Sequence, residues 1–61
     1  MHPLIDFLKA RPAINRSQFA RECEMSRTML DFIMRNVNQP KRELHNRIIT
    51  VMRHYGYKGK G

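Results

Sequence analysis

Apolar residues recur at helical spacing along this chain, and they nowhere alternate convincingly with a period of two. The clearest stripe lies near the C-terminus and consists of Leu44, Ile48, Val51, Met52 and Tyr55. Side chains three, four and seven positions apart share one face of an α-helix. Because the chain has only 61 residues, its helices must share one small core, which predicts a single all-α domain.

Two capping signals mark the starts of short helices in the middle of the chain. Asn15 precedes Gln18 by three residues, the spacing of a capping box, and Ser26 is a second favourable N-cap. We therefore expect one short helix from Asn15 to about Cys23 and another that begins at Ser26.

Proline and glycine delimit the outer helices. Pro3 suits a first helical turn, and Pro12 ends the same helix near Ala10 because the residue before proline avoids helical geometry. A last helix is expected from about Pro40 to Tyr55, with Gly56 as its C-terminal cap.

The expected architecture is a compact bundle of about four short helices formed by residues 1–55. A flexible basic tail is expected at 56–61, where all three glycines of the chain lie. Lys and Arg number 12 against five Asp and Glu, and the net charge of +7 favours a nucleic-acid partner.

The remaining composition argues against several classes of protein. Cys23 is the only cysteine, so it cannot form an internal disulfide, and we expect it to be a small buried apolar residue. The three histidines lack zinc-ligand spacing, and His45 and His54 are expected to be solvated. No apolar run approaches a membrane span, and no signal-peptide core is present. Without a convergent acid, base and nucleophile, the sequence predicts no enzyme, cofactor or small-molecule substrate.

The stretch 16–35 is the most informative one. Its two short helices, joined by about two residues, must cross steeply if their apolar faces are to share a core. The small side chain of Ala20 permits that close crossing, Met25 fills the corner, and Leu30 seals the pair from the second helix. These requirements are those of a helix-turn-helix.

These residues resemble the helix-turn-helix of Cro and CI-type phage repressors. The positions that match the family pattern are Ala20, Met25, Ser26, Leu30 and Ile33. The opening residues 4–8 are also similar to the first helix of small Cro-type proteins. The sequence departs from the pattern at Glu24, where the family usually carries glycine. If the backbone is left-handed there, a non-glycine residue costs about 1–2 kcal/mol.

The resemblance implies a sequence-specific repressor that binds a double-stranded DNA operator in the cytoplasm of a bacterial host. It further implies a homodimer, at least on DNA, and base contacts from the start of the third helix. The implied base contacts are Ser26, Arg27, Thr28, Asp31 and Phe32. The implied phosphate contacts are Asn15, Arg16, Ser17, Gln18, Arg35, Asn36, Asn38, Lys41 and Arg42. For dimerisation we expect Ile49, Tyr55 and Tyr57, since Ile49 lies off the main apolar stripe.

Other assignments stay open. Asp31 has the spacing to pair with Arg27 or Arg35 instead of a base, and Phe32 fits an inward position together with Met29. As a whole, the chain also fits a helix-turn-helix adaptor or antitoxin-like partner without a DNA target of its own. A basic amphipathic helix at 41–55 would suit a membrane surface, although Glu43 and Asn46 interrupt its polar face. RNA binding is a further alternative, for which the sequence carries no module signature.

Overall fold

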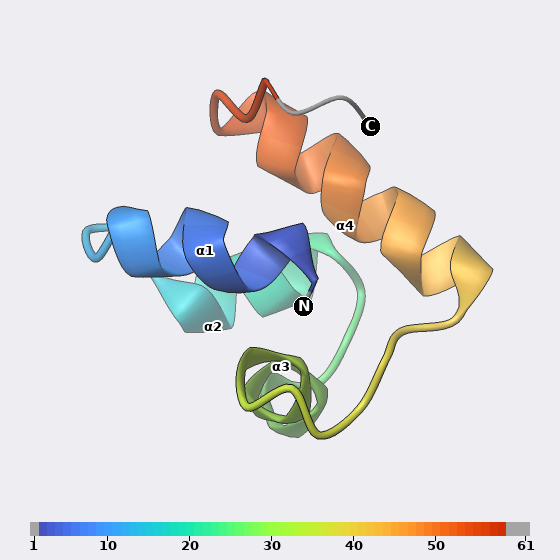
Figure 1. Ribbon diagram of the computed structural model, residues 1–61. Coiled ribbons are helices and arrows are strands. Elements are labelled where there is room, and N and C mark those ends of the chain that lie inside the picture. Colours follow the sequence, from blue (N-terminus) through green and yellow to red (C-terminus); the bar gives the residue numbers. More distant parts are fainter. Residues whose placement is uncertain (1, 59–61) are drawn as a thin grey trace.

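The computed structural model describes residues 2–58, which contain four α-helices and no strand (Figure 1). The helices are α1 (Pro3–Ala10), α2 (Arg16–Glu22), α3 (Arg27–Met34) and α4 (Arg42–His54). This confirms the predicted all-α bundle of short helices. The start of α4 differs from the prediction by two residues, because Lys41 is extended and is the N-cap.

The helices enclose one core. α2 packs against α3, while α1 packs against both α4 and α3. In Figure 1, α3 is seen nearly end-on below α1 and α2, and α4 runs along the right-hand side from the yellow loop to the C-terminal end. All four helices contribute to the core, which comprises Leu4, Phe7, Leu8, Phe19, Ala20, Cys23, Leu30, Ile33, Ile48, Ile49, Val51 and Met52.

Side-chain caps begin three of the four helices. The Asn15 side chain accepts a hydrogen bond from the Gln18 N–H at 3.0 Å, and Ser26 Oγ accepts one from the Met29 N–H at 3.0 Å. Both predicted N-caps are thereby confirmed. α1 is capped by His2, whose Nδ1 accepts from the Leu4 N–H at 3.1 Å.

The cap on α1 belongs to a histidine pair. His2 is only 6% exposed, and its Nε2 lies 2.8 Å from Nδ1 of His45 on α4. Because Nδ1 of His2 already accepts from Leu4, the ring proton of neutral His2 must be on Nε2, which donates to His45. Burial, followed by the charge that His45 would carry, lowers the pKa of His2. The expectation that His45 is solvated was wrong, because α1 brings His2 against it.

The end of α4 is also held in place. Gly56 has a positive φ of 102° and donates its N–H to the Arg53 carbonyl at 3.0 Å, which confirms it as the cap. The Tyr57 N–H donates to Met52, and the Tyr57 ring packs edge-on against Phe7 with 5.6 Å between centroids. The first part of the expected flexible tail is therefore packed on the bundle, and residues 59–61 lie outside the described part of the chain.

Candidate nucleic-acid interface

The connection between α2 and α3 is a tight left-handed turn at Glu24. Glu24 has a φ of 58° and donates its N–H to the Arg21 carbonyl, and Met25 donates to the Ala20 carbonyl, both at 3.0 Å. This pair of bonds is the Schellman motif, in which glycine is the usual left-handed residue. The chain therefore makes the turn of a helix-turn-helix with a strained residue in the place of glycine.

The junction of the two helices is buried. Ala20, Cys23, Leu30 and Ile33 are all buried, and Met25 lies half-buried against them. Burial raises the pKa of the Cys23 thiol to about 11, with a smaller contribution from the Glu22 carboxylate. The thiol therefore stays protonated at neutral pH, and the expectation of a buried apolar cysteine is confirmed.

The outward face of α3 carries the residues that the resemblance assigned to base contacts. Ser26, Arg27 and Thr28 are exposed, and Asp31 is half-exposed one turn later. Phe32 is 40% exposed whereas Met29 packs against the core, so the alternative in which both turn inward is wrong. Donors, acceptors and an aromatic ring thus share one exposed surface, since Arg27 and Asp31, like Thr28 and Phe32, are four residues apart and lie on one side of the helix.

Arg27 links this surface to α2. Its Nε donates to Asp31 Oδ1 at 3.3 Å, the pairing that the spacing of four residues had left open. Its Nη1 donates to Ser17 Oγ, also at 3.3 Å, which ties the start of α3 to the first turn of α2. Ser17 was predicted to contact phosphate, and in this structure its hydroxyl accepts the hydrogen bond from Arg27.

The residues expected to contact phosphate flank this surface on two sides. At the start of α2, Arg16 is half-buried, while Asn15, Ser17 and Gln18 are exposed. Those that follow α3 are all exposed: Arg35, Asn36, Asn38, Lys41 and Arg42. Asn38 and Lys41 line a hollow of about 320 Å³ together with Met29, so the structure brings the loop before α4 against α3.

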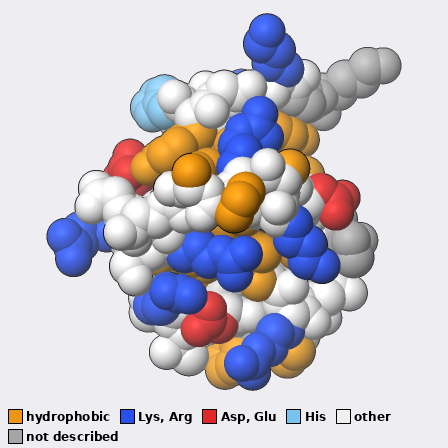
Figure 2. Space-filling model, turned by 90° about the vertical axis from the view of Figure 1, so that its left-hand side faces the viewer, with side chains coloured by type: hydrophobic (Ala, Val, Ile, Leu, Met, Phe, Trp, Pro, Cys, Tyr) orange, Lys and Arg blue, Asp and Glu red, His pale blue; other side chains and the backbone are white. Residues whose placement is uncertain are grey.

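Among the charged side chains on the face at the left of Figure 1, most are basic. Figure 2 shows Lys and Arg side chains spread over its middle and lower part, with only scattered acidic groups between them. Such a surface attracts the phosphate backbone of nucleic acid without regard to sequence.

The residues expected to form a dimer surface are engaged within the chain. Ile49 is only 9% exposed and belongs to the core, so the prediction that it lies off the apolar face was wrong. The hydroxyl of Tyr55 donates to the Glu22 carboxylate, which raises the pKa of Tyr55, and its ring lies 5.5 Å from that of Phe19. Tyr57 covers Phe7. α4 is packed on more than one side, which a single amphipathic stripe does not reveal.

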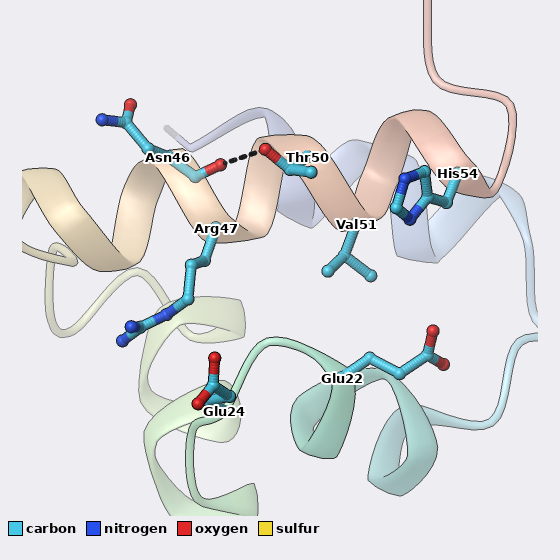
Figure 3. A pocket seen from close by; sticks show the side chains of 7 residues that line it. All are labelled: Glu22, Glu24, Asn46, Arg47, Thr50, Val51 and His54. Carbon is cyan, nitrogen blue, oxygen red and sulfur yellow. Dashed lines mark hydrogen bonds between the residues drawn. The ribbon is translucent and has the colours of Figure 1, made fainter.

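A second hollow lies between the turn and α4 (Figure 3). It measures about 470 Å³ and is lined by Glu22, Glu24, Asn46, Arg47, Thr50, Val51 and His54. Its charges have both signs, and Thr50 Oγ1 donates to the Asn46 carbonyl at 2.9 Å. The sequence did not indicate this hollow, since its residues come from segments that meet only in the fold.

Two structural observations bear on other classes of protein. Within residues 2–58 no three potential metal-ligating side chains gather at one point. None of the helices in this range has the length and apolar character needed to cross a bilayer.

No family model matches this chain, and neither does any curated protein or solved structure.

Proposed function

We propose that this protein is a sequence-specific, double-stranded-DNA-binding transcriptional repressor of the phage Cro type. The observation that carries the proposal is the surface formed by the start of α3 and the first turn of α2. There Arg27 reaches from one helix to the other, and the surrounding groups are donors, acceptors and cations.

In this proposal α3 lies in the major groove, with its N-terminal half toward the base edges. Arg27 donates to guanine O6 and N7, Thr28 contacts a neighbouring base or phosphate, and Phe32 packs on a thymine methyl group. The exposure of Phe32 supports this role, because a large apolar side chain on an otherwise polar surface gains from an apolar contact.

The phosphate backbone supplies the sequence-independent part of the affinity. The start of α2 presents backbone N–H groups and Gln18, and Arg35, Lys41 and Arg42 are exposed cations that follow α3 in the chain. If a dimer neutralises about six to eight phosphates, a plot of the logarithm of the association constant against the logarithm of the salt concentration should have a slope of about −5 to −7.

Repression would follow from occupancy of an operator that polymerase also needs, in the cytoplasm of a bacterial host. A homodimer on a two-fold symmetric site places its half-sites about 34 Å apart. Since Ile49, Tyr55 and Tyr57 are used within the chain, this dimer would form through other residues or only on DNA.

The test is selection of bound fragments from a random pool of double-stranded DNA at physiological salt. We expect convergence on an inverted repeat for the wild type, and for Arg27→Ala we expect loss of the preferred base at one position of each half-site. Arg53→Ala removes the same charge from an exposed position near the end of α4, and this control variant should select the wild-type site.

Two other outcomes would contradict the proposal. Salt-sensitive retention without convergence would favour an architectural protein or an adaptor whose basic surface has no sequence preference. The absence of any retained DNA would overturn the proposed function and direct attention to a protein partner.

A further inference from the structure

Arg27 is held from two sides before any ligand arrives. A guanidinium group has five N–H donors, of which the Nε donor is used by Asp31 and one Nη1 donor by Ser17. Five donors minus these two leaves three, all on Nη1 and Nη2. The part of Arg27 that remains free is therefore the end of the group, which can form two parallel hydrogen bonds.

The tether lies at the surface, where a ligand can reach it. The side chains of Arg27 and Asp31 are 47% and 41% exposed. An exposed ion pair of this kind contributes little to the stability of a fold. It does, however, restrict a long side chain that would otherwise sample many rotamers, and a side chain restricted in advance loses less entropy on binding.

We propose that Asp31 and Ser17 are positioning residues for Arg27, and that the three together read one guanine in each half-site. This inference rests on the proposed function. It assigns Asp31 to Arg27 rather than to a base of its own, because Oδ1 of Asp31 is already engaged.

Guanine is the base that fits the free end of Arg27. Its major-groove edge presents two neighbouring acceptors, O6 and N7, to the two remaining Nη groups. Adenine presents an acceptor beside a donor, so one N–H of Arg27 would face another N–H. The negative charge of Asp31 beside the guanidinium also disfavours a phosphate oxygen as an alternative ligand.

The experiment compares base preference at each position of the selected site for wild type, Arg27→Ala, Asp31→Ala, Asp31→Asn and Ser17→Ala. Asp6→Ala is the matched control, since it also removes one exposed carboxylate but lies on α1. Circular dichroism melts of every variant establish that the fold is kept before DNA binding is measured.

We expect wild type to prefer guanine at one position by about tenfold or more, and Arg27→Ala to abolish this preference. Asp31→Ala should reduce the preference at the same position to about threefold or less, while Asp31→Asn, which keeps an acceptor, should restore part of it. Ser17→Ala should have a smaller effect there, and Asp6→Ala none. Arg27→Ala and Asp31→Ala combined should lose no more than Arg27→Ala alone.

Three results would overturn the inference. If Asp31→Ala loses preference at a different position, Asp31 reads its own base and the proposed function stands. If it changes no preference while Arg27→Ala does, the pair is only a surface contact. If the wild type selects no common site, the proposed function and this inference both fail.

The tether also has a test without DNA. In the free protein, the Arg27 Nε–H should exchange with solvent more slowly than that of Arg53, and Asp31→Ala should remove the difference. Equal exchange in the wild type would overturn the inference whatever the DNA selection shows, so the two failures are distinguishable.

Discussion

The two outer helices and the two inner helices use their side chains differently. α1 buries four of its eight side chains and α4 four of thirteen, whereas α2 buries two of seven and α3 two of eight. Most positions of α2 and α3 therefore remain on the surface, and these helices depend on capping and on the turn between them. The outer helices contribute most of the buried side chains, and the inner helices present polar and charged side chains at the surface.

The C-terminal ends of three helices also differ, in the residue that adopts the left-handed conformation. α2, α3 and α4 all terminate in Schellman motifs, and their left-handed residues are Glu24, Asn36 and Gly56. Glycine adopts this conformation without strain, and asparagine tolerates it. Glutamate does so at a cost, and it is found at the turn between the two inner helices.

The largest expected effect on stability distinguishes alanine substitutions at the two phenylalanines of the inner helices. Phe19→Ala removes a fully buried ring and should destabilise the protein by about 3–5 kcal/mol, enough to unfold a domain of this size. Phe32→Ala removes a 40% exposed ring and should change the unfolding free energy by less than about 0.5 kcal/mol. Urea melts followed by circular dichroism measure both, and equal losses would contradict the placement of Phe32.

A smaller effect should come from the cap of α3. Ser26→Ala leaves the Met29 N–H without its acceptor and should cost about 1 kcal/mol. Ser26→Asn keeps an acceptor at the same position and should stay close to wild type in the same melts. An alanine variant as stable as wild type would mean that burial, rather than capping, holds α3.

Substitution at the left-handed turn should increase the stability of the protein rather than lower it. Glu24→Gly relieves about 1–2 kcal/mol of backbone strain in the folded state. Glycine also increases the conformational entropy of the unfolded chain, which offsets part of this effect. The free energy of unfolding should therefore rise by about 0.5–1 kcal/mol. Asn36→Gly is the matched control at the same φ of 58°, and it should gain less because asparagine tolerates this region. A Glu24→Gly protein that is unchanged or less stable would show that the Glu24 side chain compensates for its backbone.

The mildest effect concerns pH and the outer helices. The pKa of His2 lies below its ordinary value near 6.5 in the folded state, so the unfolded chain binds more protons as pH falls. The contribution of the His2–His45 pair to the free energy of unfolding is present above pH 6.5. It is lost as pH falls from there toward the pKa of His2 in the folded state.

This pH dependence can be isolated by substitution. His2→Asn keeps a capping side chain without the titrating ring, and it should flatten the decline in thermal stability between pH 7 and 5. His54→Asn changes an exposed histidine and should retain the wild-type decline. If His2→Asn declines as steeply as wild type, the histidine pair does not contribute to it.

Local signals explain why so much of the fold was predictable. Asn15, Ser26 and Gly56 each act within a few residues of their own position, so each helix end could be recognised without knowing its neighbours. The junction at Ala20 was predictable for a similar reason, because two short helices so close in sequence have few ways to cross.

The misplaced residues share one cause. Ile49 and His45 both lie on α4, and their surroundings depend on which other helices cover it. The tethering of Arg27 by Ser17 likewise joins residues ten positions apart on different helices. No spacing rule within one helix contains this information.

By itself, then, the sequence determined the four helices, the caps at Asn15, Ser26 and Gly56 and the excess of positive charge, since these depend on neighbouring residues or on composition. Only the tertiary structure decided that Ile49 is buried, that His2 and His45 meet, that Tyr57 covers Phe7 and that Ser17 holds Arg27. The physical reason is that burial and side-chain hydrogen bonds between helices depend on the relative orientation of whole helices. That orientation is set by the packing of the shared core.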